Sequence, residues 1–273
     1  MTIRKGVISK FMTIVTNLKV HSFVPVWASF KGFSLLFDNP GDSYSGLSGF
    51  AGLEKMDARR EEPALAFYRK LNEITGQMER ELIGDYLYCP LPPNSYHVTV
   101  WDGINDYNAG RLNEGERAEA YRLLQEMPAS FHADHKALQD SGGEPIGMET
   151  EPIRFAYDRC EKWNHSSIVA LLKPADERSE VALRRLEMKR EELNLRFEER
   201  FGIVPASKKY RPHVSLGYLA NKTIGEQAED AVHRLNGKLA DGMAGTTIRF
   251  PGISLYGMTD METFFRWKKD QGN

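Results

Sequence analysis

The sequence predicts an α/β fold of the α+β type: one bilobal domain over residues 1–273, with two lobes related by a pseudo-twofold axis. Three observations lead to this fold class. A tetrapeptide with the alternation of a β-strand occurs twice, and the elements around it recur in the same order. A length of 273 residues fits one large domain or two closely packed lobes. We therefore expect mostly antiparallel sheets flanked by helices around a central cleft, with lobe repeats at about 30–150 and 151–273 and an N-terminal extension at 1–28.

The repeated tetrapeptide reads His97-Val98-Thr99-Val100 in its first copy and His213-Val214-Ser215-Leu216 in its second. Successive side chains of a strand leave opposite faces, so the histidine and the hydroxyl share one face and the apolar residues share the other. Ser215 is the more informative hydroxyl, because threonine favours strands by propensity and serine does not. A single histidine on a strand is most often a satisfied core residue, but two in matching surroundings favour a shared functional site.

The first half places its motif after a strand and a helix. The run Phe33 to Phe37 is strand-like, and apolar residues at spacings of three and four predict a helix over about 63–84. A proline-containing loop then leads to the motif. A second helix at about 114–127 and a strand at 153–155 follow.

The second half repeats this order. A strand at 167–172 precedes a long charged helix at 176–201, which Gly202 ends. After the second motif, Thr223 to Glu226 has capping-box spacing for another helix. The remaining elements are a strand at 248–250, an edge strand at 263–268, and exposed loops at 38–50 and 139–150.

The charge balance limits the nucleic-acid partners that the chain can bind. A net charge of −2 argues against electrostatic binding of long duplex nucleic acid, so an anionic ligand must meet a local basic patch. Lys208, Lys209 and Arg211, directly before the second motif, are the best candidates. A solvated basic loop is the alternative interpretation of this run.

Cysteine content and hydropathy place the protein in a reducing compartment. Two cysteines form no disulfide framework and match no zinc spacing. No apolar run approaches the roughly 18–20 residues that span a bilayer. We expect a cytoplasmic protein with no membrane partner, no metal and no cofactor; the sequence leaves its oligomeric state open.

The two motifs suit acid–base chemistry on a phosphate. Two imidazoles with an ordinary pKa near 6.5 can hold complementary protonation states, so His97 and His213 can act as general base and general acid. Thr99, Ser215 and Arg211 can bind the non-bridging phosphoryl oxygens. Such an in-line attack on a phosphodiester needs no metal ion.

Three aromatic residues near the motifs are candidates for stacking a nucleotide base. Trp101 shares the nominal face of His97, and Tyr96 and Tyr210 flank the two motifs. Packing in the core is the alternative role of each.

The pair of His-apolar-Thr/Ser-apolar motifs resembles the two-histidine (2H) phosphoesterase superfamily, which includes cyclic phosphodiesterases and RNA ligase-like proteins. The resemblance implies a bilobal fold with both motifs lining a central cleft. It implies metal-independent hydrolysis of a 2′,3′-cyclic phosphate or a 2′–5′ bond in a nucleotide or short RNA end. By this resemblance His97 and His213 are the acid–base pair, and Thr99 and Ser215 hold the phosphate. A non-catalytic nucleotide-binding module and an RNA-end ligase-like enzyme are the alternatives.

Overall fold

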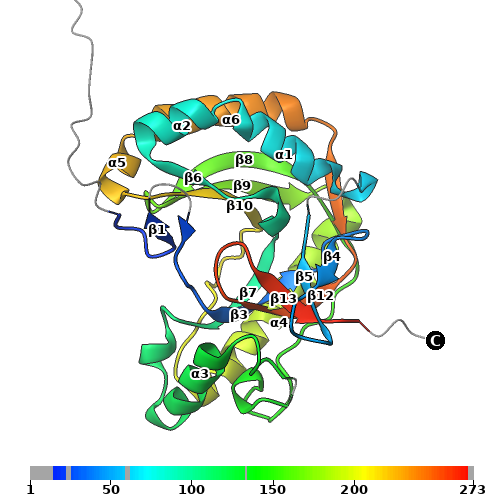
Figure 1. Cartoon of the computed structure of the whole chain (residues 1–273). Helices are drawn as coiled ribbons and strands as arrows, with labels where there is room; N and C mark the ends of the chain where they lie inside the picture. Colours follow the sequence, from blue (N-terminus) through cyan, green and yellow to red (C-terminus); the bar gives the residue numbers. More distant parts are fainter. Residues whose placement is uncertain (1–14, 23–25, 59–61, 133, 270–273) are drawn as a thin grey trace, which may run out of the picture.

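The structure, a computed structural model, describes residues 15–22, 26–58, 62–132 and 134–269. It contains two large antiparallel sheets with helices on their outer sides, which confirms the predicted fold class (Figure 1). Residues 1–14 and 23–25 of the expected N-terminal extension lie outside the described ranges. No helix in the described part of the chain combines the length and apolar character needed to span a bilayer.

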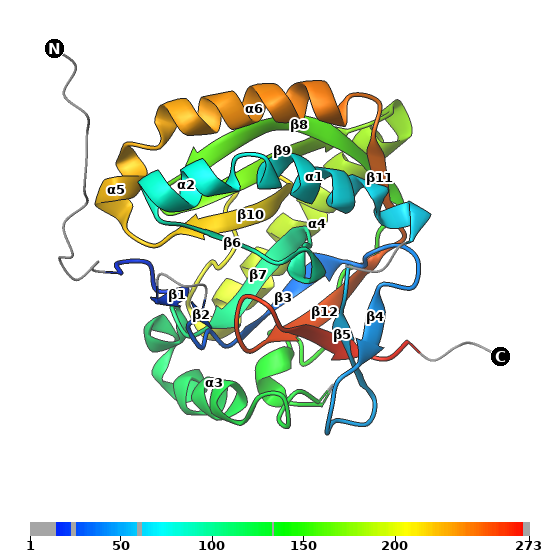
Figure 2. The ribbon, with the colours of Figure 1, turned by 45° about the horizontal axis from the view of Figure 1, so that its top comes forward.

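The first sheet has five strands in the order β11-β8-β9-β10-β6. Helices α1 and α2 and the parallel α6 cover its outer face, as Figures 1 and 2 show. The bounds are β6 Tyr88–Pro90, β8 Ile153–Trp163, β9 Ser167–Pro174, β10 His213–Leu219, β11 Thr247–Phe250, α1 Ala66–Gly76, α2 Glu79–Tyr86, α5 Lys222–Glu226 and α6 Glu229–Met243.

The second sheet has six strands in the order β4-β5-β13-β12-β3-β7. Helix α3 lies beyond this sheet in both views (Figures 1 and 2). A short hairpin of β1 and β2 forms a separate two-stranded sheet. The bounds are β1 Val20–Ser22, β2 Val26–Trp27, β3 Gly32–Phe37, β4 Tyr44–Gly46, β5 Leu53–Met56, β7 Thr99–Asn105, β12 Ile253–Met258, β13 Phe264–Trp267, α3 Glu114–Glu126 and α4 Glu177–Phe201.

The two sheets exchange strands between the halves of the chain. Strand β6 from the first half joins the five-stranded sheet, and β12 and β13 from the second half join the six-stranded sheet. The segment expected as an edge strand, β13, instead pairs with β5 on one side and β12 on the other. The alternation at 263–268 predicted a strand, but the number of its neighbours depends on residues far away in the sequence. The division at 150 therefore stays a prediction about sequence repeats and does not separate the sheets.

Aromatic packing joins the two sheets. Phe37 of β3 stacks on Phe250 of β11 at a centroid distance of 5.0 Å and meets Phe155 of β8 edge-on at 5.6 Å. All three rings are fully buried. The contacts hold one sheet against the other.

Two helix boundaries differ from the sequence prediction. The helix expected over 63–84 is interrupted at residues 77–78, directly after Gly76, a residue of low helix propensity. The helix expected to begin at Thr223 begins earlier, because Asn221 accepts a hydrogen bond from the amide of Ile224 at 3.1 Å. By contrast, α4 begins after Asp176 and ends at Gly202 as predicted.

Candidate active site

The two motifs lie side by side where the sheets meet. Val98 and Val214 form an antiparallel bridge, and both side chains are fully buried. Antiparallel pairing at this bridge puts His97 opposite Ser215 and Thr99 opposite His213, all on the face turned away from the valines. The four side chains line one cavity of about 290 Å³. The two histidines occupy diagonal positions, which are roughly 7–8 Å apart in such a pair.

Each histidine ring is oriented by a hydrogen bond to the backbone carbonyl two residues before it. His97 Nδ1 lies 2.7 Å from the carbonyl oxygen of Ser95, and His213 Nδ1 lies 2.9 Å from that of Arg211. A carbonyl only accepts, so Nδ1 carries the proton and donates in both rings. Each neutral imidazole therefore has an unprotonated Nε2. These two lone pairs are the acceptors with which the histidines can take a proton from a bound molecule.

The environment keeps both histidines neutral. Burial lowers the pKa of His97 to about 4. The hydrogen bond to the Ser95 carbonyl raises this pKa, whereas the charges of His213 and Lys19 lower it further. Burial likewise lowers the pKa of His213 to about 4, and Lys19 and Arg211 add to the shift. A phosphate bound between the rings would oppose these effects, because its negative charge stabilises the imidazolium form.

A β-bulge interrupts each motif strand at the same place. On β7, Thr99 and Trp101 face consecutive residues of β3, so Val100 is the extra residue. On β10, Ser215 and Gly217 face consecutive residues of β9. Each bulge resets the alternation of its strand. As a result, the residues five positions after the histidines, Asp102 and Tyr218, also line the cavity.

Lys19 enters the same cavity from the segment before β1. Its Nζ donates to the hydroxyl of Tyr218 at 3.1 Å. Burial alone would lower the pKa of Lys19, but Tyr218 and Asp102 outweigh it and raise the pKa above its ordinary value. The ammonium therefore stays charged across the working range of the histidines.

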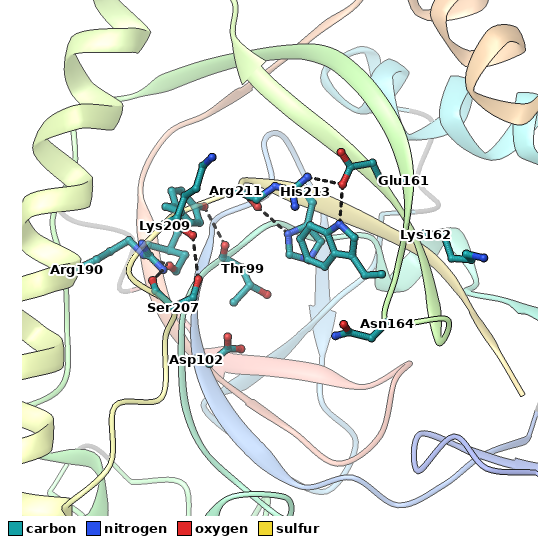
Figure 3. Close-up of a pocket in the computed structure, with 13 residues that line it drawn as sticks. Thr99, Asp102, Glu161, Lys162, Asn164, Arg190, Ser207, Lys209, Arg211 and His213 are labelled. Atoms are coloured by element: carbon teal, nitrogen blue, oxygen red, sulfur yellow. Dashed lines mark hydrogen bonds and ion pairs between the residues drawn. The ribbon is translucent and has the colours of Figure 1, made fainter. Parts of the chain in front are cut away.

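Figure 3 shows a second cavity, of about 520 Å³. It adjoins the first and shares Thr99, Asp102, Trp163 and His213 with it. The ring of Trp163 lies 4.4 Å from that of His213. Trp163 is partly exposed in the wall of both cavities. The basic residues in this wall are Lys162, Arg190, Lys209 and Arg211.

Arg211 lies in the second cavity rather than between the two histidines. Its guanidinium is bonded to Glu161 and lies over the ring of Trp163 at 5.1 Å (Figure 3). Burial alone would raise the pKa of Glu161, but hydrogen bonds from Arg159, Trp163 and Arg211 lower it to about 2. Arg211 thus already has an ionised partner, and its role as a phosphate ligand stays a prediction.

All three aromatic residues proposed for base stacking are buried in the core. Trp101 is fully buried, donates to Asn194 at 2.9 Å and packs edge-on against Phe197. The bulge at Val100 causes this, because it turns Trp101 away from the face of Thr99. Tyr96 is 2% exposed, and its ring packs against Tyr68.

The third, Tyr210, positions the first motif. Its hydroxyl donates to the carbonyl of Thr99 at 2.9 Å, while the guanidinium of Arg190 covers its ring at 4.2 Å. Because the guanidinium occupies this face of the Tyr210 ring, a base cannot stack on it. Tyr210 nonetheless belongs to the wall of the second cavity.

Sequence reasoning missed Lys19, Asp102 and Trp163. A strict two-residue alternation does not place the residue five positions after each histidine in the cavity; the β-bulges do. Lys19 lies 199 residues from its partner Tyr218, and no local pattern links them. Trp163 ends the long strand β8, whose length the short run at 153–155 did not reveal.

No family model and no curated protein matches the chain. Similar solved structures include a conserved protein of unknown function, ATU0111, from Agrobacterium tumefaciens str. C58, with 12% identity, a TM-score of 0.46, and coverage of 90% of this chain and 88% of that one. They also include Escherichia coli LigT in apo form, with 10% identity, a TM-score of 0.37, and coverage of 89% and 96%. Usb1 of Kluyveromyces marxianus with uridine monophosphate has 13% identity, a TM-score of 0.37, and coverage of 88% and 97%. At these values the likeness carries no conclusion about function.

Proposed function

We propose that the protein is a phosphodiesterase that hydrolyses a 2′,3′-cyclic phosphate or a 2′–5′ phosphodiester bond in a nucleotide or short RNA end. The observation that carries the proposal is the placement of His97, Thr99, His213 and Ser215 on one face around one cavity. This is the set of groups that an in-line displacement at phosphorus requires: one acceptor, one donor and hydroxyls for the non-bridging oxygens.

The reaction balances with the side chains of the cleft. Nε2 of the neutral histidine takes a proton from water as the water oxygen attacks phosphorus. Nε2–H of the protonated histidine gives its proton to the departing ribose oxygen as the P–O bond breaks. Thr99 and Ser215 donate to the non-bridging oxygens during this step. The two histidines end with exchanged protonation states, and solvent restores the starting state.

The dimensions of the cleft agree with a small nucleotide substrate. A cavity of about 290 Å³ lies just below the range for small-molecule sites, roughly 300–1,000 Å³. The adjoining 520 Å³ gives room for a neighbouring nucleotide of a short RNA. Metal independence, the absence of a cofactor and a cytoplasmic location stay predictions.

The test uses the full chain with nucleoside 2′,3′-cyclic phosphates and with 2′–5′ dinucleotides. We expect turnover that EDTA does not change and that falls roughly 10²–10⁴-fold in His97→Ala and in His213→Ala. The control is His233→Ala, because His233 is exposed on α6. Nucleotide binding without turnover would favour the non-catalytic module, and joining of RNA ends would favour the ligase-like alternative.

A further inference from the structure

The segment before β1, residues 15–22, is fixed to the five-stranded sheet. Its backbone amides at Thr16 and Asn17 both donate to the carbonyl of Ala220, at 2.9 and 3.2 Å. The buried Asn17 side chain donates to the carbonyls of Ser166 and Leu219 at 2.9 and 3.0 Å. We call residues 15–22 the arm. These bonds set the position of the arm at the end of β9 and β10, beside the cleft.

The arm brings Lys19 into the cavity of the two histidines. Asn17 Oδ1 also accepts a hydrogen bond from the backbone amide of Lys19 at 3.1 Å, which fixes the turn at residues 18–19. The ammonium then lies 4.8 Å from the ring centroid of Tyr218 and 5.2 Å from that of Phe30. Among the described residues that line this cavity, Lys19 is the single lysine or arginine.

The position of the ammonium follows the pseudo-symmetry of the motifs. Tyr218 accepts a hydrogen bond from it, and Asp102, at the equivalent place on the other motif strand, attracts it electrostatically. Its charge also acts on both histidines. The ammonium thus lines the same cavity as both histidines, Asp102 and Tyr218.

We propose that Lys19 is a catalytic residue that contacts a non-bridging oxygen of the scissile phosphate and stabilises the transition state. This rests on the phosphodiesterase function proposed above. A phosphodiester carries one negative charge, and attack by a deprotonated water adds a second in the transition state. A fixed cation in a partly desolvated cavity therefore stabilises the transition state more than the substrate.

A second consequence concerns the pH dependence of the histidines. His97 is faced by His213 and Lys19, and His213 by Lys19 and Arg211; Asp102 and Tyr218 surround Lys19 itself. Removing the ammonium removes a charge that opposes protonation of both imidazoles. The pKa of each histidine then rises, and the pH optimum of kcat/KM moves upward with it.

The test compares Lys19→Met with Lys19→Arg in the full chain. We expect Lys19→Met to lower kcat/KM roughly 10²–10³-fold, as loss of one oxyanion donor does, and to shift the pH optimum upward. Lys19→Arg keeps the charge and should recover most of the activity. Leu18→Ala is the first control, because it changes an exposed side chain of the arm next to Lys19. Lys238→Met is the second control, because it makes the same change of net charge at an exposed position on α6.

A second readout separates this inference from the proposed function. Binding of uridine 3′-monophosphate, measured by calorimetry, should weaken at least tenfold in Lys19→Met with the thermal midpoint unchanged. A parent protein that turns over no phosphodiester would overturn the proposed function, while the nucleotide titration still tests Lys19. If Lys19→Met keeps activity within threefold of an active parent, or Leu18→Ala loses as much, the inference fails.

Discussion

The chemistry of single residues depends on how each imidazole is surrounded. His97 lies 4.2 Å from the ring of Phe264, and His213 lies 4.4 Å from that of Trp163. Burial removes the water that would solvate an imidazolium ion, so the charged form is disfavoured on both sides of the cleft. The protein without substrate therefore holds two neutral bases, and the proton for the leaving group must arrive with or after the substrate.

This arrangement predicts an acidic optimum for the second-order rate. Burial lowers the pKa of both histidines to about 4, so the singly protonated form of the free protein declines as pH rises above that value. We expect kcat/KM to peak below pH 6. The kcat profile should peak at higher pH, because the bound phosphate raises the pKa of the histidine that it touches.

Steady-state rates from pH 3.5 to 9 at constant ionic strength check this prediction. His233→Ala, which changes a histidine remote from the cleft, should leave both profiles in place. A kcat/KM maximum at or above pH 7 would contradict the neutral state of the two imidazoles.

The four motif residues could be predicted from sequence, because period-two alternation is a local property of a strand. The residues beyond them could not. The sequence alternation puts Trp101 on the same face as Thr99, but the bulge at Val100 turns the Trp101 side chain to the opposite face of the strand. Arg211 was the nearest basic residue in sequence, yet its charge is bonded to Glu161, 50 residues earlier.

At the scale of elements, the bulges decide which side chains reach the cleft. The pairing of β10 with β6 depends on Gly217, since a Cβ there would lie 2.4 Å from the ring of Tyr88 and 2.5 Å from the carbonyl oxygen of Cys89. Strand β6 can pair closely with β10 only because this position has no side chain.

Gly217→Ala is therefore expected to destabilise the fold by about 1–3 kcal/mol, as overpacking does, and to lower activity by displacing Ser215. Gly237→Ala is the matched control, because Gly237 lies on α6 and a Cβ there meets nothing within 4 Å. It should stabilise the helix by about 0.5–1 kcal/mol. Urea denaturation measures both changes; equal stabilities for the two variants would show that the close contact at β6 yields without strain.

Element types were predictable from sequence and element partners were not. The pattern at 176–201 gave a helix with its cap at Asp176 and its end at Gly202, since both signals are local. The pattern at 263–268 gave a strand, but its place between β5 and β12 depends on residues about 200 positions away. A long-range contact of this kind leaves no trace in local periodicity.

At the scale of the whole molecule, the buried histidines couple stability to pH. The folded pKa of each is about 4 and the unfolded value is 6.5, so the unfolded chain binds more protons between these limits. Stability that is complete above pH 6.5 is therefore lost as the pH falls toward 4.

The double variant His97→Asn with His213→Asn should lose less stability on acidification than the parent. Between pH 6.5 and 4, we expect the difference in unfolding free energy between the double variant and the parent to change by on the order of 1 kcal/mol per pH unit for each histidine. Urea unfolding at pH 7, 6, 5 and 4.5 measures it, and the carboxylates shared by both proteins cancel in the comparison. Parallel stability curves for the two proteins would contradict the lowered pKa values.

The position of β13 between β5 and β12 has a consequence for biosynthesis. On the ribosome, β3 and β5 emerge long before their partners β12 and β13, which end at Met258 and Trp267. Until these two strands have left the exit tunnel, β3 and β5 each lack a neighbouring strand, and Phe264 is not yet in place against His97. The cavity of the two motif histidines can therefore close only after β12 and β13 have been synthesised, and a nascent chain stalled earlier would expose open strand edges to chaperones.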